Sequence, residues 1–152
     1  MSRSEDRIGK YGQRVVASIL SSLGVLMVEP IGTPIKAIPH PRLRGYYRVI
    51  WEETVSGDHR GILPGGRSVL AETKTILDRN LQWSDLRPHQ PIGLTQHADA
   101  GGLSLLVWVH SSGVYVMKWP VPGFGPGTSI NQEKALSLSV NDFSKENALC
   151  QS

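Results

Sequence analysis

Three residues suited to metal-dependent chemistry, Asp58, Glu72 and Lys74, lie in one short stretch of this 152-residue chain. Carboxylate oxygens are ligands that Mg²⁺ prefers, and one or two of them suffice because the ion keeps several waters. The main-chain carbonyl of Thr73 would supply a further oxygen. The ammonium group of Lys74 could stabilise negative charge that develops at phosphorus, or hold an activated water. This combination of residue types suits phosphodiester hydrolysis.

A β-hairpin would bring these residues together. The first strand is predicted to start near Asp58, the turn to lie at Pro64-Gly65-Gly66, and the return strand to run through residues 69–74. Side chains alternate along a strand with period two, so Glu72 and Lys74 would face the same side. The hairpin is therefore expected to place Asp58 near both of them.

Two interpretations of these residues are open. Glu72 and Lys74 could form a surface strand pair while Asp58 caps a turn. The apolar run Val69-Leu70-Ala71 directly before Glu72 instead favours a central, buried strand. A buried strand that carries a glutamate and a lysine needs a reason, because burying charge without a partner is costly. We therefore favour the functional interpretation.

Length and composition place the chain among globular proteins of one domain. Its 39% hydrophobic and 19% charged residues are ordinary values, and no apolar run approaches the ~20 residues that span a bilayer. The polar N-terminus lacks the apolar core of a signal peptide. Cys150 is the one cysteine, which excludes an intramolecular disulfide and a cysteine-based zinc site. These features predict a cytoplasmic protein, and the net charge of +3 permits a polyanionic partner.

A basic and aromatic segment lies upstream of the hairpin, at about residues 34–53. Between Lys36 and Arg48 the chain contains no acidic residue. The segment could be a solvated loop, but its one-signed charge favours an arm that contacts phosphates and stacks on bases. The residues expected to bind DNA are Lys36, Arg42, Arg44, Arg48, Tyr46 and Tyr47.

The remaining pattern predicts an α/β fold with a mixed sheet. The helix predicted near Pro88 to Ala100 would separate two strands and allow a parallel crossover, with Gln90 in its first turn. Its predicted neighbours are a helix at 5–23, a buried strand at 25–28, an irregular proline-containing segment at 32–41, a strand at 46–53, a polar loop at 77–85, strands at 103–109 and 113–119, and a short helix at 132–138. Residues 1–119 would form the core, and 120–152 a Pro/Gly-rich linker with a polar tail.

An ordered set of motifs resembles a known superfamily. Gly57-Asp58-His59-Arg60-Gly61, Glu72-Thr73-Lys74 and His89-Gln90 resemble the PD-(D/E)XK nucleases, and more narrowly the RecU-type Holliday junction resolvases, also called the penicillin-binding protein-related factor A group. Residues 32–38 resemble the Thr-Pro-containing strand of that group, and Gly101-Gly102-Leu103 also fits. The resemblance covers about residues 5–119.

This resemblance implies a restriction-endonuclease-like αβββαβ core, usually a homodimer that cuts four-way DNA junctions with Mg²⁺, for which Mn²⁺ could substitute. Asp58 and Glu72 match the metal ligands, Lys74 the catalytic lysine, and Gln90 a glutamine that completes the site. Thr73 would add its carbonyl oxygen, and Ser56 stands where the group has a threonine at the metal. Residues 36–53 overlap the region that projects into the junction.

Some features of the resemblance leave alternatives open. Gln13 stands where superfamily members often carry a helix glutamate, and Arg60, beside Asp58, joins the residues expected to contact DNA. The same core serves nucleases that act on linear duplex or DNA ends, of restriction or phage-repair type. An inactive DNA-binding module of this fold is a further alternative. The histidines lack paired metal-ligand spacing and are expected to be structural or solvent-facing, with His89 as a candidate exception because it adjoins Gln90.

Overall fold

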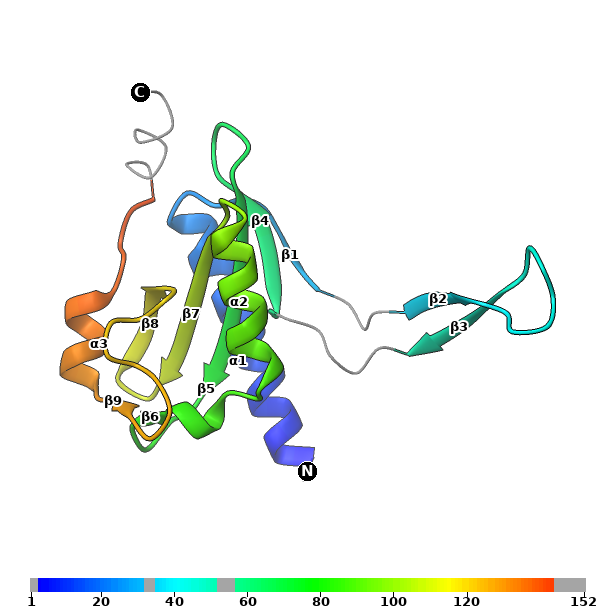
Figure 1. The fold of residues 1–152 in the computed structure, drawn as a ribbon. Helices are drawn as coiled ribbons and strands as arrows, with labels where there is room; N and C mark the ends of the chain where they lie inside the picture. The colour runs from blue at the N-terminus through cyan, green and yellow to red at the C-terminus, as the bar shows by residue number, and fades with distance from the viewer. Residues whose placement is uncertain (1–2, 32–34, 52–56, 144–152) are drawn as a thin grey trace.

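A five-stranded mixed sheet lies between helices at the centre of the molecule (Figure 1). The structure is a computed structural model that describes residues 3–31, 35–51 and 57–143, without the side chains of residues 3–10, 35–36 and 49–51. Its elements are α1 (Arg3–Ser22), β1 (Leu26–Pro30), β2 (Ile35–Pro39), β3 (Tyr47–Trp51), β4 (His59–Ile62), β5 (Ser68–Thr75), β6 (Leu81–Gln82), a 3₁₀ helix η1 (Trp83–Asp85), α2 (His89–Asp99), β7 (Leu103–His110), β8 (Gly113–Lys118), β9 (Ser129–Ile130) and α3 (Gln132–Leu138).

The strands of the large sheet follow the order β1-β4-β5-β7-β8. Neighbouring strands are antiparallel except β5 and β7, which are parallel because α2 carries the chain across between them. The predicted hairpin is present, since β4 pairs with β5 in a register that sets His59 opposite Ala71. The predicted α/β class and mixed sheet are therefore confirmed.

The two faces of the sheet bury separate apolar clusters. Val16 and Leu20 of α1 pack on one face against Ala71 of β5, whereas Leu94 of α2 packs on the other against Trp108 of β7. All residues of β7 are buried. Because β5 lies between β4 and β7, its side chains alternate between two covered faces. The side chain of a charged residue in the middle of β5 is consequently buried, whichever face it lies on.

The strand predicted at residues 25–28 differs from the expected buried strand. β1 is an edge strand in which Leu26 and Met27 are exposed, whereas Val28 is partly buried against the core and Val25 just before the strand is fully buried. The register shifts between Leu26 and Glu29, and Met27 has a positive φ of 51°. This β-bulge accompanies the exposure of Leu26 and Met27.

The proline-containing segment at 32–41 is more regular than predicted. β2 pairs with β3 over five residue pairs, from Ile35 opposite Trp51 to Pro39 opposite Tyr47. A two-stranded ribbon tolerates proline because each strand has an unpaired edge. This hairpin stands off the large sheet as a separate arm (Figure 1). The segment predicted as a polar loop at 77–85 also contains structure, namely β6, which pairs with β9, and η1.

Residues 120–143 pack on the domain. Val121, Phe124 and Ile130 are buried in the cluster on the α2 side, and Phe143 is buried against the α1 side. The short helix predicted at 132–138 is α3, with Asn131 accepting a hydrogen bond from Lys134 N as its N-cap. The polar residues 144–152 lie outside the described part of the chain. No helix among the described residues is long and apolar enough to cross a membrane.

Candidate metal centre

Asp58 and Glu72 are held together by a reciprocal pair of hydrogen bonds. The main-chain N–H of Gly57 donates to Glu72 Oε2 at 3.1 Å, and that of Thr73 donates to Asp58 Oδ2 at 2.9 Å. Asp58 N also donates to Ala71 O at 2.8 Å, which fixes the start of β4 against β5. Each carboxylate is thus fixed by the main chain beside the other. The predicted juxtaposition of the two acids is present.

Glu72 lies in the interior, with only 2% of its surface exposed. Its Oε1 accepts a hydrogen bond from Gln90 Nε2 on α2 and lies 3.4 Å from Lys74 Nζ. Lys74 is largely covered as well, with 17% of its side chain exposed. The predicted common face of Glu72 and Lys74 is therefore correct, and the interpretation as an exposed strand pair is wrong.

Gln90 orients Glu72 through its side-chain amide. α2 begins at His89, so Gln90 lies in the first turn as predicted. Its Oε1 accepts a hydrogen bond from Arg87 N at 2.8 Å, which leaves the amide nitrogen to face Glu72. In this arrangement the oxygen of Gln90 is engaged by the main chain. Gln90 therefore positions the Glu72 carboxylate, and its predicted part in binding the metal stays a prediction, because Oε1 has a second lone pair.

Burial, and after it the charge of Asp58, raise the pKa of Glu72 to about 7. The Lys74 ammonium group and the Gly57 N–H oppose this shift and are already included in that value. The two carboxylates carry more negative charge than Lys74 balances. A cation between them would remove the repulsion that raises the pKa of Glu72.

The main chain of Thr73 faces Asp58, whereas its side-chain hydroxyl is buried without a partner among the described residues. Its N–H points toward Asp58, and the N–H and C=O of a strand residue point to the same side, so its carbonyl also faces β4. Its Oγ1 is buried and has no hydrogen-bond partner among the described residues. The role of the carbonyl as a metal ligand stays a prediction. Ser56 lies outside the described residues.

The donor set fits a hard divalent cation. The described parts of the chain contain no group of three or more histidine, cysteine, aspartate or glutamate side chains that could together hold a metal ion. Two carboxylates with one carbonyl would therefore leave several positions to water. Mg²⁺ retains its waters and binds through one or two carboxylates, whereas structural Zn²⁺ sites need four nitrogen or sulfur ligands.

The sequence interpretation missed the role of Gly57. Its φ is +87°, and a Cβ at this position would come within 2.4 Å of Leu70 Cδ1. The residue therefore has to be glycine for its N–H to reach Glu72. A glycine directly before an acidic strand start was the available signal.

The sequence interpretation also missed an ion pair beside Lys74. Arg79 donates two hydrogen bonds to the Asp85 carboxylate, at 2.6 and 2.8 Å. These bonds from Arg79 lower the pKa of Asp85, and Lys74 adds a smaller effect in the same direction. The pair connects the end of β5 to η1, from which the chain continues into α2. It thereby fixes the approach of α2 to the carboxylates.

His59 and Gln13 lie on the α1 side of the sheet. His59 is buried with 2% exposure, and its ring donates to the main-chain oxygen of Gln13. Burial lowers the pKa of His59 in spite of the nearby Asp58 charge. The Gln13 residue itself is exposed. His59 Nδ1 is buried and has no hydrogen-bond partner among the described residues, and the structural role expected for His59 stays a prediction.

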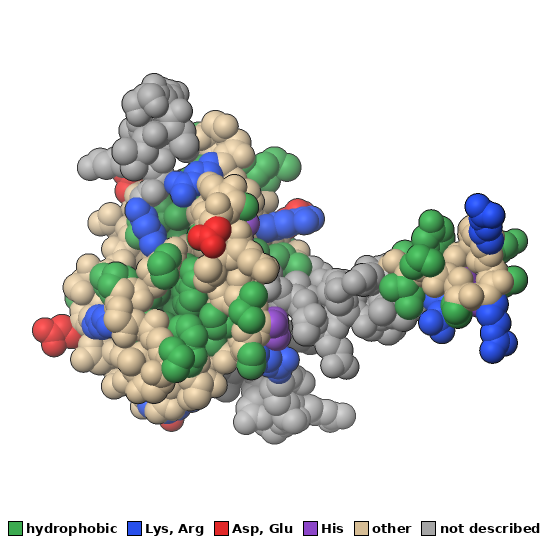
Figure 2. Space-filling view, in the orientation of Figure 1, with side chains coloured by type: hydrophobic (Ala, Val, Ile, Leu, Met, Phe, Trp, Pro, Cys, Tyr) green, Lys and Arg blue, Asp and Glu red, His purple; other side chains and the backbone are tan. Residues whose placement is uncertain are grey.

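The arm β2–β3 exposes basic and aromatic side chains together. Tyr46 and Tyr47 are 66% and 67% exposed, and Arg42, Arg44 and Arg48 are also exposed. Figure 2 shows Lys and Arg side chains around the end of this hairpin, interleaved with hydrophobic ones. The ring of His40 accepts hydrogen bonds from the main-chain N–H groups of residues 42 and 43, which shapes the turn.

Lys36 and Arg60, also predicted to bind DNA, are not among these exposed side chains of the arm. The side chain of Lys36 is outside the described residues, although its main chain belongs to β2. Arg60 is in β4 and pairs with Glu29 of β1 at 2.6 Å. Its charge is shared with that carboxylate. Arg60 is therefore not part of the arm.

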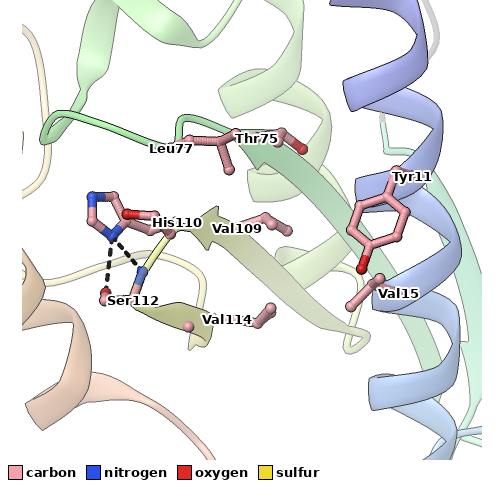
Figure 3. A pocket seen from close by; sticks show the side chains of 10 residues that line it. Tyr11, Val15, Thr75, Leu77, Val109, His110, Ser112 and Val114 are labelled. Carbon is pink, nitrogen blue, oxygen red and sulfur yellow. Dashed lines mark hydrogen bonds between the residues drawn. The ribbon is translucent and has the colours of Figure 1, made fainter.

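A separate pocket of about 540 Å³ opens on the α1 side of the sheet. Figure 3 shows Tyr11 and Val15 of α1 facing Val109 and Val114 across it, with Thr75 at the end of β5. Thr75 and Lys74 point to opposite faces because strand side chains alternate. The pocket is mostly apolar and includes none of the residues around Glu72. It is not the candidate metal centre.

Comparisons with models of known protein families and with curated proteins find no match to this chain.

Proposed function

We propose that the chain is a Mg²⁺-dependent endodeoxyribonuclease of the PD-(D/E)XK type that cuts branched DNA. The observation that carries this proposal is the reciprocal hydrogen bonding of Asp58 and Glu72, with Lys74 beside them on a central strand. Two fixed carboxylates suit a Mg²⁺ ion, and a lysine beside them suits the stabilisation of charge during phosphodiester hydrolysis. Their burial argues against a surface ion pair without function.

The arrangement of the elements supports a restriction-endonuclease-like core. α1, β1, β4, β5, α2 and β7 follow one another in the order αβββαβ, apart from the inserted arm and the short elements β6 and η1. The sheet has the matching mixed pairing, with β5 parallel to β7. The carboxylates lie on β5 and at the start of β4, where the resemblance expects them.

The arm supports a DNA substrate with a branch point. It bears three exposed arginines and two exposed tyrosines, which suit phosphate contacts and stacking on unpaired bases. Linear duplex offers few unstacked bases, whereas a junction has a central opening. The resemblance also implies a homodimer, which would set two metal centres on one four-way junction.

Asp58 and Glu72 would hold the Mg²⁺ ion, with the carbonyl of Thr73 as a further oxygen. The ion would lower the pKa of a water and neutralise charge on the phosphate. Gln90 keeps the Glu72 carboxylate in position through Nε2. Lys74, with its ammonium group close to Glu72, would stabilise negative charge on the scissile phosphate or orient the attacking water.

The proposal is tested by cleavage of a four-way junction and of a linear duplex with the same arm sequences, each with and without Mg²⁺. We expect Mg²⁺-dependent cleavage of the junction. Lys74→Ala should abolish cleavage and retain junction binding, whereas Lys118→Ala, which changes an exposed lysine on β8, should retain both. Sedimentation of the protein with and without DNA would show whether it is a dimer.

Each alternative gives a distinct outcome in this assay. Equal cleavage of junction and duplex, or cleavage from duplex ends only, would replace the branched substrate and keep the nuclease. Binding without cleavage at any Mg²⁺ or Mn²⁺ concentration would indicate an inactive DNA-binding module. If Lys74→Ala lost binding together with cleavage, the role assigned to Lys74 would be wrong.

A further inference from the structure

A second group of polar side chains lies at the other end of β5. His97, in the last turn of α2, contacts Ser68 at the start of β5 and Ser104 at the start of β7. Ser68 and Lys74 are six positions apart on one strand, which corresponds to about 20 Å. The group is therefore remote from the metal centre, and its chemistry does not rest on the proposed nuclease function.

The hydrogen bonds determine which nitrogen of His97 carries the proton. Ser104 Oγ donates to the main-chain oxygen of Leu94 at 2.7 Å, so its single proton is committed. Ser104 Oγ can then only accept from His97 Nδ1, at 2.8 Å. In the neutral ring, Nε2 consequently carries the lone pair. The partner of that lone pair is Ser68 Oγ, at 2.9 Å, which has to be the donor.

The surroundings keep His97 neutral and its ring fixed. Burial lowers the pKa of His97, and the charge of Arg67 acts in the same direction. Gly102 leaves room for the ring, because a Cβ there would come within 2.3 Å of His97 Cε1. Arg67 donates to the main-chain oxygens of residues 101 and 102, which holds the loop after α2 in place.

Ser68 differs from a serine whose hydroxyl group only links two segments of the fold. The residue is exposed, so water could satisfy its hydroxyl group without any partner in the protein. Its hydroxyl instead points at the basic nitrogen of a ring that is oriented from behind by Ser104. A nucleophile, a base and a group that orients the base, each within hydrogen-bond distance, are the arrangement that activates a serine.

We propose that Ser68 is a nucleophilic serine, activated by His97, that takes an acyl group from an activated ester. Ser68 Oγ bonds to the ester carbonyl carbon as its proton passes to His97 Nε2. The bond from that carbon to the leaving oxygen then breaks, and the leaving oxygen takes the proton from His97. The products are acyl-Ser68 and an alcohol, so no oxidant or further reactant is needed.

The test uses the full-length protein and p-nitrophenyl acetate as the acyl donor. Intact mass and peptide mapping should locate one acetyl group per chain at Ser68, and Ser68→Ala should remove it. His97→Gln should slow the labelling of Ser68 by about 100-fold, the lower range of general-base effects. Circular dichroism and thermal unfolding would show whether the His97 variant is folded. The location of the acetyl group in the wild-type protein tests the proposal independently of that variant.

Ser137 supplies a matched control. It is also an exposed serine, but its hydroxyl donates to the main-chain oxygen of Lys134 at 2.7 Å and not to a basic nitrogen. Ser137→Ala should leave the labelling unchanged. Labelling that falls on lysines or on Ser137 as readily as on Ser68 would overturn the proposal. So would an unlabelled Ser68, or equal labelling rates in the wild-type protein and a folded His97→Gln variant.

Discussion

Replacing Glu72 by glutamine should change how the stability of the protein depends on pH. Burial and the Asp58 charge raise the pKa of Glu72 from its ordinary value of 4.5 to about 7. An acid whose pKa is higher in the folded state contributes fully below its unfolded pKa and loses that contribution as the pH rises through the folded pKa. The wild-type protein should therefore lose about 3 kcal/mol between pH 4.5 and values above 7, at ~1.4 kcal/mol per pKa unit.

The Glu72→Gln variant should lack this loss. A glutamine cannot accept hydrogen bonds at both ends, so it would leave either Gly57 N or Gln90 Nε2 facing an NH₂ group. That mismatch costs about 1–3 kcal/mol at every pH. The informative quantity is therefore the change in unfolding free energy between pH 5 and pH 8, compared between the two proteins.

Urea unfolding without divalent cations, followed by tryptophan fluorescence, measures this change. Burial lowers the pKa of both His59 and His97, and these groups contribute alike in both proteins. Their contributions cancel in the comparison. If the wild-type protein and Glu72→Gln showed the same pH dependence, the buried and repelled carboxylate inferred from the structure would be wrong.

Three further predictions concern the metal, the main chain and the arm. Mg²⁺ or Ca²⁺ should raise the melting temperature of the wild-type protein more at pH 8 than at pH 6, because a proton on Glu72 competes with the cation. Asp58→Asn should largely remove this increase, and calorimetry measures it in both proteins. Gly66→Ala should lower the free energy of unfolding by about 1–2 kcal/mol, because alanine is strained in the left-handed conformation and the site is otherwise open. Gly57→Ala should lower it by about 1–3 kcal/mol more, because its Cβ would overpack against Leu70. Urea unfolding measures both values, and equal losses would contradict the close contact at Gly57. Arg44→Ala should make the negative slope of log binding constant against log salt smaller in magnitude by about 0.7–0.9 in junction titrations, with unchanged stability. An unchanged slope would exclude Arg44 from phosphate contact.

The hairpin that carries the candidate site was predictable because its signals are local. A Pro-Gly-Gly turn with strands on both sides sets the register, and the period of two then places Glu72 and Lys74 together. The helix start near Pro88 followed from the missing proline N–H, which put Gln90 in the first turn. These predictions needed no knowledge of the tertiary packing.

The rest of the site depends on how side chains pack in the folded chain. The glycine before Asp58 signals an unusual backbone, but it does not show that its N–H meets Glu72 on the next strand. Arg87 and Gln90, like Arg79 and Asp85, are close in sequence, yet their residue types alone do not fix the direction of the Gln90 amide or select Asp85 as the partner of Arg79. The misjudged strand at β1 has the same origin. Its apolar residues predicted burial, but a bulge and a position at the sheet edge expose Leu26 and Met27. Edge position is a property of the sheet and not of the segment.

The buried position of Glu72 explains why its ionisation lowers the stability of the fold, and why the surrounding structure does not relax to avoid this loss. Domains of this kind are stable by only about 5–15 kcal/mol, so ~3 kcal/mol at one residue is a large fraction. An apolar residue in central strand β5 would avoid it. The chain instead fixes Glu72 with Gly57 N and Gln90, and fixes Asp58 with Thr73 N, which prevents the carboxylates from moving apart to relieve their repulsion. Because one lysine cannot balance both charges, a divalent cation is the species that would convert this cost into binding free energy.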